Sequence, residues 1–221
     1  MKKFLCLLSI SVGLVFSSIA SAIIIDGSVT GGSANTQGAT FHDLGSAPAG
    51  LVVGNDTIQD PNLYGFNEDQ NILLGADLAI DVGGAFLSAG LEVASHYIFF
   101  DPAGGTTITG WVDFDSDILG IITSTTNLAN SDFLINNDVT YLNPGLRGLE
   151  AGQDLAWIDP TYSNRLNLSF YAATPGDYIR VLTEHSPMAA VPAPGTLALF
   201  LLGVIGLSSR VYKKQSAKMA A

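Results

Sequence analysis

The stretch "NRLNLSFYAATPGDYIRVLTE", residues 164–184, carries the clearest secondary-structure signal in the chain. From Arg165 to Tyr171, apolar side chains occupy every second position, which is typical of a strand with one buried face. Pro175-Gly176 is a turn signal, and "DYIRVLTE" after it is rich in β-branched and aromatic residues. The stretch therefore predicts two strands, and we expect them to pair as a hairpin.

The same signals recur upstream. The segments "EVASHYIFF" (92–100) and "TTITGWVDF" (106–114) flank a turn with two glycines, so they predict a second hairpin. Residues 125–135 predict a short helix with Thr125 or Thr126 as its N-cap. The glycine-rich segment 26–40 is either an edge segment or a loose lead-in. Further strands are expected at residues 51–53, 72–80 and 155–158.

Many short strands separated by Gly, Pro, Asn and Asp favour an all-β architecture over an α/β fold. We expect a mainly β fold, an antiparallel β-sandwich or jelly-roll-like domain with at most one or two short helices. There is no internal repeat and no second composition class, so residues 23–188 are predicted to form one β-rich exported domain.

Residues 1–22 read as a signal peptide. Lys2 and Lys3 precede an apolar core, and Ala20 and Ala22 supply the small-residue pattern that signal peptidase cleaves. The mature chain is expected to begin near Ile23. The alternative is an uncleaved anchor, although the apolar core is shorter than the roughly 20 residues that a spanning helix needs.

The exported segment is strongly acidic. Residues 23–190 hold no lysine, three arginines and all 20 acidic residues, a formal charge of −17. Such a surface repels nucleic acid and attracts cations, so we exclude nucleic-acid binding. The single cysteine, Cys6, lies in the signal peptide, so the exported domain has no disulfide and no cysteine ligand.

The C-terminal end has three parts. A Pro-rich linker and motif (189–194) precede an apolar, transmembrane-like helix (195–209) and a basic cytoplasmic tail (210–221). The uninterrupted apolar run, 195–207, would reach about 20 Å as a helix, less than the roughly 30 Å of a bilayer core. The two prolines prevent a helix from continuing upstream.

This order resembles the PEP-CTERM sorting signal of exported Gram-negative bacterial proteins. The family pattern is Val-Pro-Glu-Pro-Ser-Thr-Leu, and Ala193 and Gly195 stand here in place of the glutamate and the serine. The positions that match the pattern are Val191, Pro192, Pro194, Thr196 and Leu197.

The resemblance implies processing by an exosortase, a membrane protease and transpeptidase found in bacteria that make exopolysaccharide. It implies an exported protein of the cell envelope or extracellular space, at least transiently anchored in the inner membrane by its C-terminal helix. The alternative is that the short C-terminal helix is not cleaved and stays in the membrane as a permanent anchor. The blocks "NLYGFNEDQNI", "SHYIFFDP", "DFDSDILGI" and "GDYIRVLT" also resemble ectodomains of other exported proteins with this signal, which carry no assigned activity.

One acidic triplet is a candidate cation site. If the strand from residue 106 continues, Asp113, Asp115 and Asp117 share one face about 7 Å apart, and calcium prefers such oxygen ligands. It is not an EF-hand loop, because Ile118 and Ser124 replace the glycine and the glutamate that such a loop requires. The alternative is an acidic turn, in which Asp bonds to its own backbone. A second acidic stretch, residues 68–70, is distant in sequence and could cooperate with the triplet only in space.

No catalytic motif stands out, so we expect a non-enzymatic protein without a cofactor other than the candidate calcium. His42, His96 and His185 are far apart in sequence and form no metal-binding motif. With 20 acidic residues, some carboxylate pair suited to glycoside hydrolysis is nearly guaranteed and carries little weight.

The predicted function is structural or adhesive, in association with exopolysaccharide. The first alternative is a calcium-dependent or glycan-binding module, and the second is a polysaccharide-acting hydrolase. Glycan binding would use aromatic side chains that face outward and stack on sugar rings. The candidates are Tyr97, Trp111, Trp157, Tyr162 and Tyr171.

Overall fold

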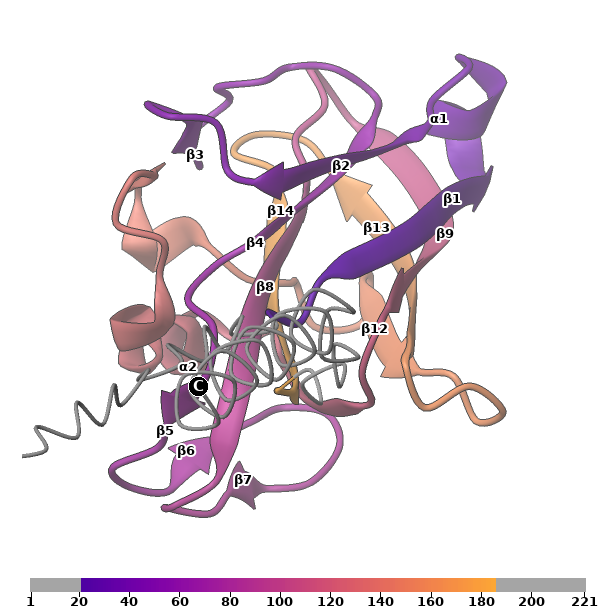
Figure 1. Cartoon of the computed structure of the whole chain (residues 1–221). Coiled ribbons are helices and arrows are strands. Elements are labelled where there is room, and N and C mark those ends of the chain that lie inside the picture. Colours follow the sequence, from indigo (N-terminus) through magenta and orange to yellow (C-terminus); the bar gives the residue numbers. More distant parts are fainter. Residues whose placement is uncertain (1–20, 186–221) are drawn as a thin grey trace, which may run out of the picture. The chain divides into compact units, whose positions relative to one another are not determined.

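Two β-sheets pack face to face in the computed structural model of this chain, which describes residues 21–185 (Figure 1). The four-stranded sheet A is antiparallel throughout and has the order β1 (Ile24–Gly31), β9 (Thr106–Phe114), β13 (Arg165–Ala172), β12 (Leu155–Ile158). The six-stranded sheet B has the order β10 (Ile118–Ile122), β14 (Asp177–Glu184), β8 (Glu92–Phe100), β4 (Leu63–Asn67), β2 (Phe41–Ser46), with β5 (Ile72–Leu73) also pairing with β8. The prediction of a mainly β sandwich is confirmed.

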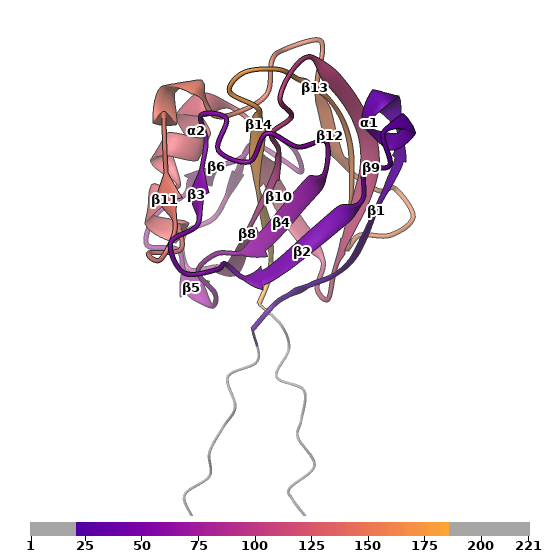
Figure 2. The same ribbon diagram turned by 90° about the horizontal axis from the view of Figure 1, so that it is seen from above.

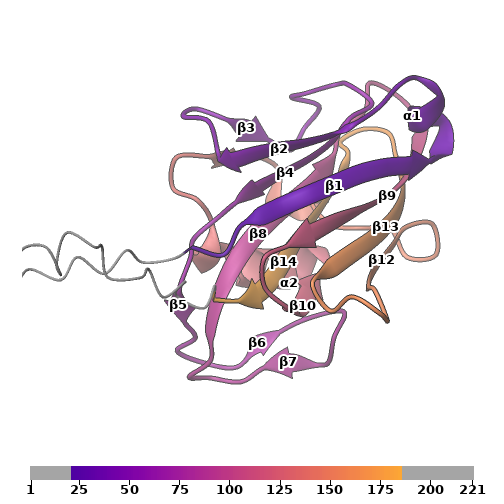
Figure 3. The same ribbon diagram turned by 45° about the vertical axis from the view of Figure 1, so that its right-hand side comes forward.

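A third layer of short elements covers the far face of sheet B. In Figure 2, α2, β3 and β11 lie on one side of the strands of sheet B, and β1 and β9 of sheet A lie on the other. The helices and 3₁₀ turns are α1 (Gly32–Thr36), α2 (Thr125–Asn130), η1 (Asp132–Leu134) and η2 (Pro144–Leu146). The short strands are β3 (Val52–Val53) paired with β11 (Thr140–Tyr141), and β6 (Leu78–Ala79) paired with β7 (Phe86–Leu87), which Figure 3 shows at one end of the domain.

Sheet B therefore lies between two hydrophobic cores. The inner core fills the space between the sheets and includes Ile98, Phe100, Ile108, Leu168 and Val181. The outer core lies between sheet B and the covering layer and includes Phe66, Phe99, Leu128, Leu134 and Tyr178. Consecutive residues of β8, such as Phe99 and Phe100, point into different cores, so both faces of this strand are buried.

Both predicted hairpins are wrong, although all four strands exist. β13 pairs with β9 in sheet A, whereas β14 pairs with β8 in sheet B. The turns at residues 101–105 and 173–176 therefore carry the chain from one sheet to the other. Because β8 and β14 are covered on both faces, they are buried almost throughout, whereas β9 and β13 alternate between buried and more exposed residues because their outer face meets solvent.

Several local predictions have mixed outcomes. The strands at 51–53 and 155–158 are present as β3 and β12, and the glycine-rich lead-in begins in the edge strand β1. The predicted strand 72–80 is divided into β5 and β6, with glycine in the bend between them. The predicted helix is present as α2, but its N-cap is Ser124, whose hydroxyl accepts a hydrogen bond from the backbone N–H of Asn127.

Within residues 21–185, no helix is long and apolar enough to cross a membrane. The predicted signal peptide core, the sorting motif and the apolar helix 195–209 lie outside the described residues.

Candidate metal centre

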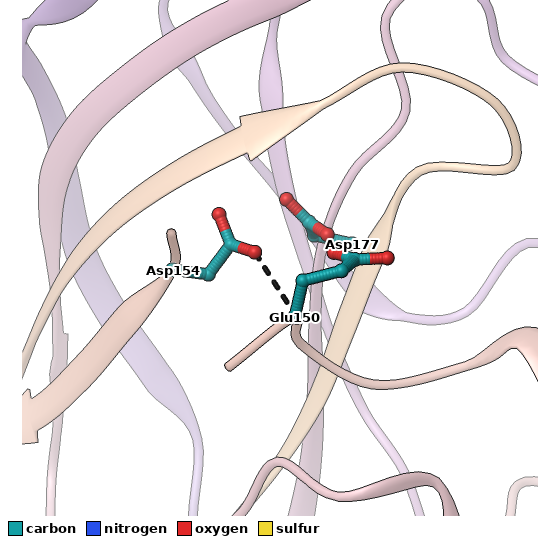
Figure 4. A group of neighbouring side chains, drawn as sticks. All are labelled: Glu150, Asp154 and Asp177. Atoms are coloured by element: carbon teal, nitrogen blue, oxygen red, sulfur yellow. Dashed lines mark hydrogen bonds between the residues drawn. The ribbon is translucent and has the colours of Figure 1, made fainter. Parts of the chain in front are cut away.

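Three carboxylates from two segments, the loop before β12 and the start of β14, converge on one point (Figure 4). Glu150 lies in the turn before β12, Asp154 immediately precedes β12, and Asp177 is the first residue of β14. One oxygen from each side chain lies within 4.8 Å of the others. Oxygens that share one Ca²⁺ at roughly 2.4 Å lie no more than about 5 Å apart, so this spacing fits a single ion.

Asp154 is held in place by the backbone of its neighbours. Its Oδ1 accepts a hydrogen bond from the N–H of Tyr171 at 2.6 Å, and its Oδ2 accepts one from the N–H of Glu150 at 3.1 Å, the contact drawn in Figure 4. These two bonds fix the orientation of the Asp154 carboxylate at the centre of the cluster.

Asp177 is the unusual member. Asp177 is only 2% exposed, and its Oδ2 has no hydrogen-bond partner among the described residues. Burial, followed by the charges of Asp154 and Glu150, raises the pKa of Asp177 to about 9. At neutral pH the site therefore requires either a proton on Asp177 or a cation that replaces it.

Glu150 closes the cluster on the solvent side. It is exposed, and burial together with the neighbouring Asp154 raises the pKa of its carboxyl group. A hollow of about 170 Å³ adjoins the cluster and is lined by Glu150, Asp177, Tyr171 and the turn 172–176. The site thus offers carboxylate ligands, and solvent can reach it to complete the shell of an ion.

No basic side chain of the described residues neutralises these acids. The described residues contain three arginines and no lysine, and each arginine forms a salt bridge elsewhere. Arg147 pairs with Asp132, and Arg165 and Arg180 pair with Asp113 and Glu68, respectively. The local field therefore favours a cation at the cluster.

The predicted triplet at residues 113–117 has a different arrangement. β9 ends at Phe114, so the three aspartates do not continue along one strand. Asp113 makes a bidentate ion pair with Arg165, with N–O distances of 2.6 and 2.7 Å. Asp117 accepts a hydrogen bond from the hydroxyl of Ser163 at 2.6 Å. The prediction of calcium at Asp113, Asp115 and Asp117 remains untested, and among residues 21–185 only Glu150, Asp154 and Asp177 form an ion-sized group.

The acidic turn at residues 113–117 also connects the two ends of the described domain. Asp115 Oδ1 accepts a hydrogen bond from the N–H of Ile23 at 2.9 Å, and the N–H of Asp115 donates to the carbonyl of Ile23 at 3.0 Å. The N–H of Glu184 donates to the carbonyl of Asp117 at 2.9 Å. The turn thus fixes the predicted first residue of the mature chain beside the last strand.

The histidines occupy unrelated places. His96 is fully buried, and its ring nitrogens contact Asn67 Oδ1 at 2.8 Å and Thr183 Oγ1 at 3.0 Å. Burial lowers the pKa of His96 to about 3, so the ring is neutral at physiological pH. His42 stacks on Tyr64, with ring centroids 5.2 Å apart, and His185 is exposed at the end of the described residues.

The aromatic candidates divide into two groups. Tyr97 is buried in the outer core, so it cannot contact a ligand in solution. Trp157, Tyr162 and Tyr171 are 39%, 55% and 45% exposed, and Trp111 is partly exposed.

The comparisons with known proteins concern the C-terminal end. No curated protein and no solved structure matches the chain, so the likeness of the exported domain to other ectodomains stays a prediction. The family model described as the PEP-CTERM protein-sorting motif matches residues 190–214, a range that includes the predicted motif residues 191–197. The chain therefore carries a PEP-CTERM protein-sorting motif, the signal of an exported protein that an exosortase sorts.

Proposed function

We propose that this protein is a non-enzymatic component of the cell envelope or extracellular matrix that binds calcium at Glu150, Asp154 and Asp177. Its role is structural or adhesive, in association with exopolysaccharide. The observation that carries the calcium proposal is the buried Oδ2 of Asp177, which has no donor among the described residues and faces two further carboxylates. The sorting motif at residues 190–214 supports a place of action outside the cytoplasm.

A bound cation explains the cluster better than a retained proton alone. A proton shared between Asp177 and Glu150 relieves one repulsion but provides no ligand for the Asp154 carboxylate that the backbone holds beside them. Ca²⁺ compensates all three carboxylates at once, and hard oxygen ligands at this spacing suit it. In an exported protein that lacks cysteine in its described part, such an ion also supplies a cross-link between turn 150–154 and strand β14.

The test is the melting temperature of the full chain in mild detergent, with EDTA or with Ca²⁺. At pH 8 and Ca²⁺ at about 100 times its dissociation constant, binding stabilises the folded state by about 2.7 kcal/mol, or roughly 5–10 °C. Asp177→Asn removes this rise, whereas the exposed Asp138→Asn, a matched change outside the cluster, retains it. An unchanged melting temperature in the wild-type chain contradicts the calcium proposal.

A hydrolase is the second candidate, because close carboxylates with a raised pKa also occur in glycosidases. Two observations disfavour it: Asp177 is 2% exposed, and the adjoining hollow of about 170 Å³ is smaller than the roughly 300 Å³ of a small-molecule site. Release of reducing sugars from any polymer in a polysaccharide panel, abolished by Asp177→Asn, would favour the hydrolase over the non-enzymatic role.

A further inference from the structure

The outer face of sheet A carries aromatic and polar side chains in register, and we propose that it binds a neutral polysaccharide. This proposal deepens the association with exopolysaccharide given above and rests on it only for the source of the ligand. The face lies on the opposite side of sheet A from the inner core, and none of the three acidic residues of the metal cluster belongs to a strand of sheet A.

Strand pairing sets the positions of the two tryptophans. Trp111 of β9 pairs with Asn167 of β13, and Asn167 pairs with Trp157 of β12. Directly opposed residues in a sheet point to the same face, so both indoles flank the Asn167 amide on the solvent side. Two strand spacings separate the tryptophan backbones by about 9.5 Å. The two indoles can thus contact separate sugar units of one extended chain.

Neighbouring rows extend this surface. Thr109 pairs with Ser169, and Ser169 pairs with Leu155, which places two hydroxyl groups beside the tryptophan row. The exposed Tyr171 pairs with Thr107 on the same face. Aromatic rings beside hydroxyl groups match a sugar, which has an apolar ring face and hydroxyl groups at its edge.

One end of the face is held rigid. The guanidinium carbon of Arg165 lies 4.2 Å from the ring centroid of Trp111 and 5.0 Å from that of Tyr162, and Asp113 fixes the guanidinium from the side. The Asn167 amide donates to Asp159 Oδ2 at 2.9 Å. Side chains held in this way lose little conformational freedom on binding, which favours recognition of a ligand by stacking.

The charge of the outer face of sheet A favours neutral polysaccharides over anionic ones. Arg165 is neutralised by Asp113, so no unpaired cation of the described residues offers a partner to an anionic sugar. Asp26 pairs with Asp113 across β1 and β9, and Asp159 lies beside Asn167, so the border of the face is acidic. An anionic polysaccharide would be repelled there, and a neutral one would not.

Intrinsic fluorescence tests this proposal selectively, because Trp111 and Trp157 are the two tryptophans of the chain. The full chain in mild detergent is titrated with hydroxyethylcellulose, laminarin and galactomannan, and with alginate as an anionic comparator. At least one neutral polymer is expected to change the emission and to protect it from acrylamide quenching. Trp157→Ala is expected to weaken that binding at least tenfold, with Trp111 still reporting it.

Phe133→Ala is the control, because Phe133 is an exposed aromatic residue (54%) in η1 of the covering layer. It should bind like the wild type. Three results would each overturn the proposal. The first is unchanged emission with all three neutral polymers, and the second is equal binding by Trp157→Ala and the wild type. The third is an emission shift when the protein alone is diluted, which would indicate that a second copy of the chain covers the face. A preserved calcium response in Trp157→Ala verifies its fold and separates this result from failure of the proposed cation site.

Discussion

Arg180 and Glu68 form an ion pair with no exposure to solvent, and it joins sheet B to the layer that covers it. Nε and Nη2 of Arg180 lie 2.6 and 2.9 Å from the two carboxylate oxygens of Glu68. Tyr141 and Ser95 donate further hydrogen bonds to Glu68, and Arg180 donates to the carbonyl of Leu128 at 3.2 Å. Removal of Arg180 leaves the buried Glu68 carboxylate without a counter-ion, and removal of Glu68 leaves Arg180 with only Asp132 at 3.7 Å.

Glu68→Gln should therefore destabilise the fold strongly. We expect a loss of about 3–5 kcal/mol, because the buried guanidinium keeps its charge but loses its bidentate partner, and Asp132 Oδ1 lies only at 3.7 Å from Nη2. For a protein of this size the melting temperature would fall by roughly 10 °C or more. The measurement is thermal unfolding followed by circular dichroism.

The exposed Glu184→Gln serves as the control and should change stability by less than about 0.5 kcal/mol. The double variant Glu68→Leu/Arg180→Met should recover part of the loss, because it removes both buried charges. A cost below 1 kcal/mol for Glu68→Gln would contradict the structural role of this pair.

The pH dependence of stability in EDTA should reflect two opposing groups. The raised pKa of Asp177, about 9, means that the folded state binds the extra proton, so this group lowers stability as the pH rises from 4 toward 9. The lowered pKa of His96, about 3, means that the unfolded state binds the proton first, so this group lowers stability as the pH drops below 6.5. The two contributions cancel between about pH 4 and 6.5, so melting temperatures should change little there and should fall from pH 6.5 toward 9.

Asp177→Asn isolates the alkaline limb, because the amide cannot ionise. The variant should melt higher than the wild type at pH 8.5 in EDTA, and it should lose stability below pH 6.5, where the contribution of His96 is no longer cancelled. Parallel alkaline limbs in the variant and the wild type would show that the ionisation of Asp177 does not control stability there.

Calcium binding should strengthen with pH, because Ca²⁺ must displace the proton of Asp177. The calcium-induced rise in melting temperature is expected to be larger at pH 8 than at pH 6, and Asp177→Asn should remove it at both values. Asp115→Ala separates the two acidic regions: it preserves the rise if calcium binds at the cluster and removes it if calcium binds at residues 113–117. The second result would support the calcium site that the sequence predicts at residues 113–117.

The strands at residues 92–100, 106–114, 165–172 and 177–184 followed from local pattern, but their pairing did not, and β2, β4 and β10 were not predicted. Leu166, Leu168 and Phe170 alternate with polar residues as a half-exposed strand requires, and β13 has that burial. β14 lacks this alternation because it is covered on both faces, and its polar residues Asp177, Arg180 and Thr183 are buried as well. Pairing strands by the presence or absence of this alternation, rather than by closeness in sequence, would have joined β9 with β13 and β8 with β14.

The metal cluster was beyond local pattern because Asp177 is distant in sequence from the other two members. Glu150 and Asp154 lie together in the loop before β12, but Asp177 reaches them only through the register of β14, which starts opposite Phe100. No local signal singles out Asp177, because β14 also carries Arg180, Thr183 and Glu184. The triplet at 113–117 was conspicuous because its acids are adjacent, yet adjacent acids in a turn are usually solvated or bonded to the backbone.

Cleavage after Ala22 has a structural consequence at the other end of the domain. The N–H of Ile23 that contacts Asp115 Oδ1 at 2.9 Å would become an α-ammonium group, which turns a hydrogen bond into an ion pair. Because Asp115 is exposed, the gain should stay below about 1 kcal/mol. Asp115→Asn should accordingly lower the stability of the mature protein only slightly.

Intact mass spectrometry of the protein recovered from the envelope and the medium of its host tests whether both terminal signals are used. We expect a species that begins at Ile23 and ends between Ala190 and Pro194, with or without an added group at its new carboxyl end. A species in the membrane fraction that still ends at Ala221 would contradict processing by an exosortase. It would make residues 195–209 a permanent anchor.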